Sequence, residues 1–228
     1  MVRTGQYTSR FQARSIQGSS SIGRAPVSKT GGCRFESCLP CHYWYDPLMI
    51  PVKLFLTGDP ACGKTTAIRK LTDRLKPHLP MTGFTTEEFR KAGRRAGFRG
   101  VTLDGQRFDL ARVGAESRFR LGPYGVVLEG LETIGIPALN PVSADVLVVL
   151  DEVGKMESFS DPFRETVLQL LDGPNPVLGT VASHGVGFVK KIRQHKNVEL
   201  VRLTRKSRDG MIGEVLRRLA RHGIGAGH

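Results

Sequence analysis

The first residues that point to chemistry form the stretch Gly58-Asp-Pro-Ala-Cys-Gly63-Lys64-Thr65. It matches the pattern G-x-x-x-x-G-K-[ST] and lies between an expected strand and an expected helix, which is the context of a phosphate-binding loop. Glycines in such a loop let the backbone curl until its N–H groups converge on phosphate oxygens. Lys64 is long enough to contact the β- and γ-phosphates of a nucleotide, and the Thr65 hydroxyl can bind Mg²⁺.

A second stretch, Asp145-Val-Leu-Val-Val-Leu-Asp151-Glu152, is an apolar run that ends in two adjacent carboxylates. A strand of this kind places Asp151 beside the phosphate loop, where it can support Mg²⁺. Glu152 is then placed to accept a proton from a water that attacks the γ-phosphate. The pattern therefore predicts Glu152 and Lys64 as catalytic residues, and Thr65 and Asp151 as ligands of a Mg²⁺ cofactor. The expected nucleotide-binding residues are Gly58, Asp59, Pro60, Ala61, Cys62, Gly63, Lys64, Thr65, Thr66 and Asp151.

Motifs of several other nucleotide-binding classes are missing from the sequence. It contains neither the Asn-Lys-x-Asp run that confers guanine specificity nor the Leu-Ser-Gly-Gly-Gln run of transporter-type ATPases. The His-Arg-Asp and Asp-Phe-Gly motifs of protein kinases are also missing. These absences agree with a nucleoside-triphosphate substrate and no built-in requirement for guanine.

The elements that position these residues follow from the pattern of apolar side chains. Apolar or alternating runs predict strands at 52–57, 98–103, 107–113, 145–151, 177–182 and 198–204. Helical spacing predicts helices at 64–76, 161–171, 187–195 and 210–222, and 122–139 fits a short strand followed by a helix. Asp161 and Pro162 are expected as the N-cap and first residue of the second helix. The alternation predicts a three-layer α/β fold with a mainly parallel central sheet, and Asp104-Gly105 predicts the turn of an inserted β-hairpin flap.

Composition excludes several classes of protein. The chain has 228 residues, of which 39% are hydrophobic, with four cysteines. Extensive disorder and a disulfide-stapled fold are both excluded, and the longest apolar run, 146–150, is too short to span a membrane. The net charge of +13 favours polyanionic partners such as phosphates or nucleic acid. Residues 190–228 hold 11 basic and three acidic side chains, a pattern more typical of a solvated face than of a binding groove.

The first 48 residues differ in composition from the rest. They are rich in Ser, Gly and Arg, show no helical or strand period, and contain three cysteines and a histidine between positions 33 and 42. A mitochondrial transit peptide would need a Leu-rich amphipathic stripe, and a zinc knuckle would need four properly spaced ligands. The segment instead resembles a conceptual translation of a transfer-RNA gene. We therefore expect an unstructured leader at 1–48 that is not native protein, a true start at Met49, a domain at 49–228 and a cytoplasmic location.

Several stretches together resemble the small nucleoside-triphosphatase family first described from thermophiles, which has a human cancer-related relative. They are Leu56-Thr-Gly-Asp-Pro-Ala-Cys-Gly-Lys-Thr-Thr66, Gly83-Phe-Thr-Thr-Glu-Glu88, Gly97-Phe98, Tyr124-Gly-Val126, Leu150-Asp-Glu-Val-Gly-Lys-Met-Glu157, Phe159-Ser160, Phe163-Arg164, Leu203-Thr204 and Arg208-Asp209. The resemblance implies a P-loop NTPase domain that hydrolyses ATP, GTP and other nucleoside triphosphates slowly, with little base preference. By the same resemblance 58–66 bind the phosphates, Asp151 supports Mg²⁺ and Glu152 is the base.

The resemblance leaves some roles open. Lys155 either contacts phosphate or forms an ion pair with Glu157. Arg205 and Arg208 are candidates for a cation that stabilises the transition state, or are simply solvated. Ser207 stands where the family often has Asn before the late Arg-Asp, and 138–144 is short for the helix usual before the Asp-Glu strand. Because Ser207 replaces this Asn, the contacts to the nucleobase of the substrate stay open.

Two other functional classes fit parts of the sequence. A phosphate-loop kinase would use the same loop, with the flap at 83–113 as an acceptor lid, but Glu152 argues against it because phosphoryl transfer to an acceptor must keep water away. A nucleotide-gated RNA-binding module would explain the positive charge of 49–228, but the chain lacks aromatic-rich strand motifs that stack bases. The expected partner is a nucleoside triphosphate, and nucleic acid is the more weakly supported one.

Overall fold

The computed structural model describes residues 51–225. The expected leader, its cysteines and the start at Met49 lie outside these residues. The strands are β1 (Lys53–Gly58), β2 (Met81–Lys91), β3 (Arg94–Thr102), β4 (Arg107–Val113), β5 (Arg120–Leu121), β6 (Tyr124–Val126), β7 (Leu147–Val153), β8 (Val177–Ala182) and β9 (Val198–Arg202). The helices are α1 (Lys64–Leu75), α2 (Leu128–Gly130), α3 (Ile136–Ala138), α4 (Asp161–Asp172), α5 (Phe188–Arg193) and α6 (Arg208–Arg221), with a π-helical turn η1 (Leu131–Gly135) and a 3₁₀ turn η2 (Glu157–Phe159).

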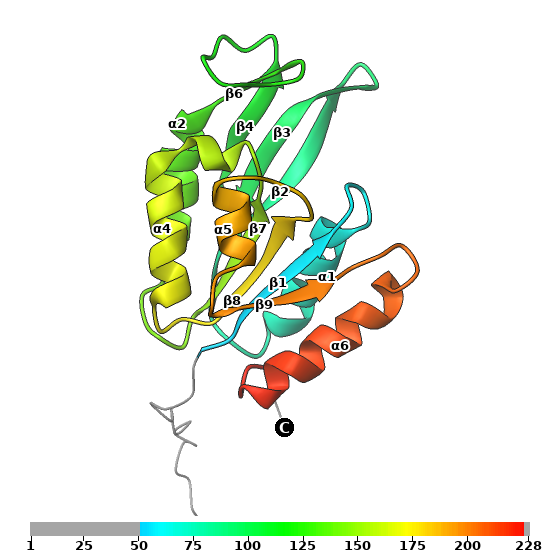
Figure 1. The fold of residues 1–228 in the computed structure, drawn as a ribbon, viewed down its shortest axis with the longest axis vertical. Coiled ribbons are helices and arrows are strands. Elements are labelled where there is room, and N and C mark those ends of the chain that lie inside the picture. Colours follow the sequence, from blue (N-terminus) through cyan, green and yellow to red (C-terminus); the bar gives the residue numbers. More distant parts are fainter. Residues whose placement is uncertain (1–50, 226–228) are drawn as a thin grey trace, which may run out of the picture. The chain divides into compact units, whose positions relative to one another are not determined.

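These strands form one sheet in the order β5-β6-β4-β3-β2-β7-β8-β1-β9 (Figure 1). Neighbouring strands are parallel along the half of the sheet that runs β2-β7-β8-β1-β9. They are antiparallel along the other half, which runs β5-β6-β4-β3-β2. The expected three-layer α/β fold with a mainly parallel central sheet is thus confirmed. The inserted hairpin turns at Gly105 as expected, but the flap is larger than a hairpin because β2, β5 and β6 extend it.

β2 belongs to both halves of the sheet. Its first residues, from Met81 to Phe84, pair in parallel with β7, and the strand continues from Phe84 to Lys91 in antiparallel pairing with β3. β2 is not among the strands predicted from the sequence. Its side chains change from apolar to Thr-Thr-Glu-Glu as it leaves the covered core, so no single period runs through it.

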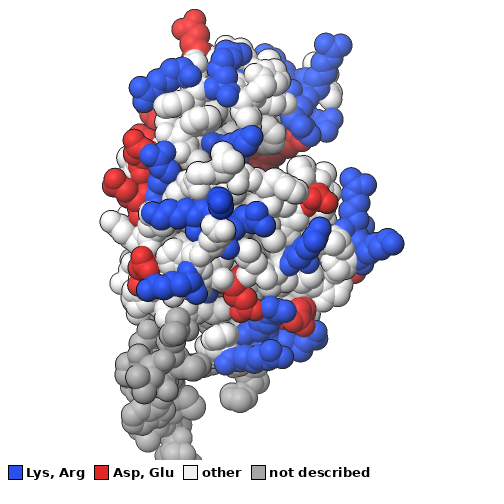
Figure 2. All heavy atoms as spheres, in the orientation of Figure 1, with Lys and Arg blue, Asp and Glu red and all other residues white. Residues whose placement is uncertain are grey.

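Helices cover both faces of the parallel strands and leave a polar outer surface. The described residues hold 28 Lys and Arg against 19 Asp and Glu. On the face that Figure 2 shows, blue side chains are spread over its length among red ones, and they do not form a single stripe. None of the helices within 51–225 is both long enough and apolar enough to cross a membrane.

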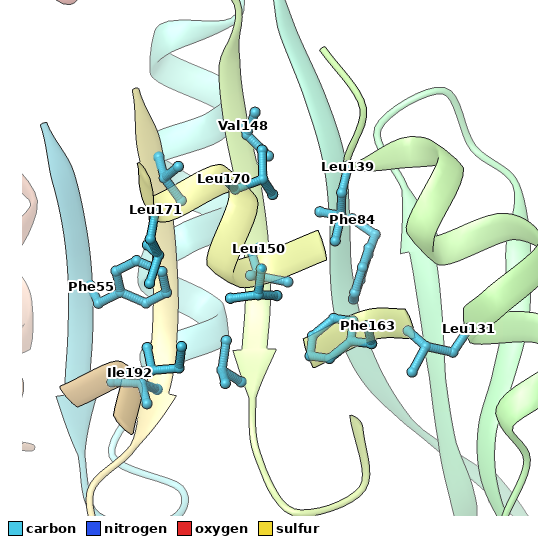
Figure 3. Packing of buried hydrophobic residues seen from close by; sticks show 14 of the residues in the cluster. Phe55, Phe84, Leu131, Leu139, Val148, Leu150, Phe163, Leu170, Leu171 and Ile192 are labelled. Carbon is cyan, nitrogen blue, oxygen red and sulfur yellow. The ribbon is translucent and has the colours of Figure 1, made fainter. Parts of the chain in front are cut away.

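Two apolar cores lie on opposite faces of the sheet. One joins Phe55 and Leu150 of the central strands to Phe163 of α4 and Ile192 of α5 (Figure 3). The other joins the alternate strand residues to the apolar faces of α1 and α6, including Ile68 and Leu71 of α1 and Val215 of α6. Because β7 contributes to both cores, its Leu-Val-Val-Leu run is buried on both faces, as expected for a central parallel strand.

The helix α4 begins one residue earlier than expected. Ser160, not Asp161, is the N-cap: its hydroxyl accepts a hydrogen bond from the Phe163 N–H at 3.2 Å and donates one to Glu132 Oε1 at 2.7 Å. Asp161 is the first helical residue, with Pro162 after it. A serine hydroxyl here satisfies an N–H that the helix itself leaves unbonded.

Candidate active site

The loop between β1 and α1 has the backbone that its glycines permit. Gly63 lies in the left-handed region with φ of +106°, immediately before the first residue of α1. A Cβ added to Gly58 would lie 2.3 Å from the carbonyl oxygen of Leu203, so no other residue fits there without a backbone shift. Of the remaining loop residues Cys62 is buried, and Asp59, Pro60, Ala61 and Thr66 are exposed. The loop is therefore held against the end of β9 on its inner side and is open on its outer side.

Lys64 lies back across the loop. Its side chain is 8% exposed, and its Nζ donates to the carbonyl oxygen of Gly58 at 3.2 Å and lies 3.8 Å from Glu152 Oε2. The structure thus brings together the two residues predicted to be catalytic. Thr65, in the first turn of α1, is partly exposed.

Asp151, at the end of β7, is fully buried and accepts three hydrogen bonds. The Thr180 hydroxyl donates to Oδ1 at 2.6 Å, and the Thr86 N–H and hydroxyl donate to Oδ2 at 3.2 Å each. Neither threonine is among the site residues predicted from the sequence. Thr86 lies within a stretch that carried the family resemblance, and Thr180 is the one hydroxyl in an otherwise apolar strand, so each had a weak signal.

Glu152 combines partial burial with access to solvent. Its side chain is 28% exposed. Burial raises the pKa of the Glu152 carboxyl and the negative charge of Asp151 raises it further, whereas the Lys64 ammonium opposes both. A raised pKa makes this carboxylate a better proton acceptor than a fully solvated one.

The segment after β7 separates Lys155 from Glu157. Lys155 is exposed, whereas Glu157 is buried and its Oε2 accepts a hydrogen bond from the Gly154 N–H at 3.1 Å. No ion pair joins the two side chains in the described part of the chain, so the pairing that the sequence left open is wrong. Burial raises the pKa of Glu157 to about 8, since two backbone N–H groups offset only part of the effect of leaving water.

The connection from β9 to α6 closes one side of the phosphate loop. The Leu203 N–H donates to the Thr57 carbonyl oxygen at 2.7 Å, and the Arg208 side chain comes within 3.9 Å of where a Gly63 Cβ would be. Ser207 stabilises this turn through reciprocal bonds with Thr204: the Thr204 N–H donates to Ser207 Oγ at 3.0 Å, and the Ser207 N–H to Thr204 Oγ1 at 3.1 Å. Arg205 and Arg208 are both exposed, and the Arg208 side chain lies beside the loop.

Comparison with known proteins agrees with this geometry. A family model described as NTPase matches residues 53–216. The chain belongs to the NTPase family. Among similar members, the nucleoside-triphosphatase THEP1 of Thermotoga sp. (strain RQ2) is 39% identical over 166 residues, which cover 72% of this chain and 94% of that protein. The human cancer-related nucleoside-triphosphatase is 38% identical over 178 residues, with 72% and 94% covered.

Two solved structures of NTPase family members share the fold. The crystal structure of THEP1 from Aquifex aeolicus superposes with a TM-score of 0.67 at 34% identity, covering 74% of this chain and 99% of that one. The solution structure of the human cancer-related nucleoside triphosphatase gives a TM-score of 0.65 at 37% identity, covering 74% and 97%. Both the family and the P-loop NTPase fold expected from the sequence are therefore confirmed.

Proposed function

We propose that this protein hydrolyses nucleoside 5′-triphosphates to the diphosphate and phosphate. The observation that carries the proposal is the 3.8 Å approach of Lys64 Nζ to Glu152 Oε2, which sets a partly exposed base beside the cation of the phosphate loop. Relatives named nucleoside-triphosphatases that are 38–39% identical over almost their whole length support it.

The chemistry follows from the residues around the loop. The loop N–H groups and the N-terminus of α1 hold the phosphates, and Lys64 places its charge on the β- and γ-oxygens. Glu152 accepts a proton as a water oxygen attacks the γ-phosphorus, and the bond from that phosphorus to the β–γ bridging oxygen breaks. The bridging oxygen leaves on the nucleoside diphosphate, and the attacking oxygen leaves with inorganic phosphate.

The donors at the site fit Mg²⁺, which prefers oxygen ligands and retains several waters. Thr65 and Asp151 are the residues that would hold it together with the phosphates. A carboxylate has about four acceptor positions. The three hydrogen bonds to Asp151 therefore leave one position for the metal or its water. When bound, the ion would neutralise charge that develops on the phosphate oxygens.

Two further cations complete the proposed site. Arg208 is better placed than Arg205 to supply charge in the transition state, because its side chain lies next to Gly63. The exposed Lys155 is proposed to contact phosphate, since it is not paired with Glu157. Because no motif selects guanine, we propose that both ATP and GTP are substrates.

Glu152→Gln and Lys64→Ala test this function by separating chemistry from binding. Glu152→Gln is expected to lower turnover by about 10²–10⁴-fold, the usual contribution of a general base. Its nucleotide affinity should change little because the amide keeps the shape of the side chain. Lys64→Ala should weaken both binding and turnover, since it removes a cation from the phosphates.

The assay measures phosphate release from ATP, GTP, CTP and UTP with Mg²⁺ or with EDTA, and nucleotide binding by calorimetry. Glu165→Gln, which removes an exposed carboxylate of α4, is the matched control and should behave as the unmodified protein. Normal turnover in Glu152→Gln would assign the base elsewhere. Nucleoside diphosphate formed only in the presence of an acceptor, with the phosphoryl group on that acceptor and no free phosphate, would indicate a kinase instead.

A further inference from the structure

Gly154 is fixed from both sides by the turn that follows it. Its N–H donates to Glu157 Oε2 at 3.1 Å, and its carbonyl oxygen accepts from the Ser158 N–H at 3.3 Å and from the Ser158 hydroxyl. The path of the chain after β7 is therefore set by Glu157 and Ser158.

Glu152 lies against this same glycine. A Cβ added to Gly154 would be 3.0 Å from Glu157 Oε2 and 3.9 Å from both Cγ and Oε1 of Glu152. The two glutamate side chains thus approach one point beside Gly154, Glu157 from the interior and Glu152 from the side of the phosphate loop. Because only Val153 separates Glu152 from Gly154, a shift of this glycine would move the Glu152 carboxylate.

Burying the Glu157 carboxyl costs free energy, and this cost indicates that the carboxyl makes an interaction that an apolar side chain could not make. It is 6% exposed and shares its surroundings with the carboxylates of Asp151 and Glu152 on β7. Lys64 approaches Glu152, and no ion pair joins a cation to Glu157 among the described residues. On the other elements packed around the turn, Arg164 of α4 donates to the Ser158 carbonyl oxygen and Glu132 of η1 accepts from Ser160. With a pKa of about 8, Glu157 carries a proton at neutral pH. An apolar side chain would fill the space at lower desolvation cost if packing were its only role.

We propose that Glu157 is a positioning residue for Glu152: its carboxyl oxygen holds the Gly154 N–H, and the fixed Gly154 holds the Glu152 carboxylate in place beside Lys64. The proposal rests on the hydrolytic function argued above. Glu157 does not touch the reacting atoms, and it acts through the backbone between the two glutamates.

Two variants separate positioning from packing. Glu157→Leu removes the acceptor, so we expect turnover to fall toward the ~10²-fold loss that a 1 Å misplacement produces, with nucleotide affinity unchanged. Glu157→Gln keeps the acceptor and is expected to restore most of the turnover lost in Glu157→Leu. Both are compared with the Glu165→Gln control by phosphate release, nucleotide calorimetry and thermal melting.

The pH profile gives a readout that a packing role would not change. As pH rises through about 8, Glu157 ionises in the unmodified protein and adds a charge beside Asp151 and Glu152, so turnover should fall. In Glu157→Gln this alkaline decline should be absent. A folded Glu157→Leu with full turnover would overturn the proposal. If Glu157→Leu does not fold, an alkaline decline in Glu157→Gln equal to that of the unmodified protein would overturn it as well. The proposed function fails separately, if the unmodified protein releases no phosphate from any of the four nucleoside triphosphates above the protein-free background.

Discussion

The hydrogen bond from Thr180 to Asp151 makes the sharpest prediction about stability. Thr180→Val replaces the hydroxyl by a methyl group and removes a 2.6 Å bond to a carboxylate, with both residues fully buried. Hydrogen bonds to charged groups contribute about 1.5–3 kcal/mol. The free energy of unfolding should fall by about that amount. For a domain of 150–250 residues each kcal/mol corresponds to about 2–4 °C, so the melting temperature should fall by about 3–12 °C.

Thr57→Val is the matched control on the neighbouring strand. Thr57 is also buried, at 7% exposure, but its hydroxyl has no hydrogen-bond partner among the described residues. Removing an unpaired buried hydroxyl relieves a desolvation cost, so this variant should be as stable as the unmodified protein or more stable. Thermal and urea unfolding of the nucleotide-free protein at pH 7 measure both. Equal melting temperatures and equal urea midpoints for the two variants would show that the hydrogen bond from Thr180 to Asp151 does not stabilise the protein.

Three further predictions concern the buried residues Lys53 and Gly58 and the leader at 1–48. Lys53 donates to two backbone carbonyls of the α4–β8 turn, and burial lowers its pKa to about 8. Between pH 8 and 10.5 the unfolded chain therefore binds more protons than the folded protein, so the free energy of unfolding should rise with pH by roughly 3 kcal/mol in total. Urea unfolding measures this rise, which should be absent in Lys53→Met. Gly58→Ala should abolish nucleotide binding in calorimetry because the added Cβ meets the Leu203 carbonyl. The control Gly210→Ala has open space around the added Cβ in α6. It should raise the melting temperature, since alanine in place of a helical glycine stabilises the fold by about 0.5–1 kcal/mol. A chain that begins at Met49 should melt and release phosphate as the full chain does, and a loss of either property would show that 1–48 contribute.

Local patterns were enough to predict the phosphate loop and the central strands. The loop pattern includes its own flanking strand and helix, and β7 is apolar on both faces because both are covered. The same reasoning missed β2, whose burial changes half-way along its length. β5 was also missed because it is two residues long and has no period to read, whereas β6 is the short strand expected within 122–139.

The contacts that complete the site are long-range and could not be predicted from local pattern. Thr86 and Thr180 lie 65 and 29 positions from Asp151 in the chain, and only the sheet order places β7 next to both β2 and β8. A hydroxyl in an apolar strand signals that some partner exists, but the partner is set by neighbouring strands. The N-cap of α4 could not be predicted for a similar reason. Ser and Asp are equally good N-cap residues, so residue type alone does not decide between Ser160 and Asp161, and only the observed start of the helix does.

The three carboxyl groups at this edge of the sheet show how surroundings assign different roles to one chemical group. Asp151 is fully buried and its charge is stabilised by three hydrogen bonds. Glu152 faces a cation and solvent, so it can exchange a proton with water. Glu157 has no cation within salt-bridge distance among the described side chains, and burial keeps it protonated at neutral pH. Three adjacent ionised carboxylates would repel the phosphates that the loop must bind. Hydrogen bonds, an ammonium group and a retained proton each remove part of that repulsion, and in the proposed mechanism Glu152 is the one of these three that would accept a proton from water.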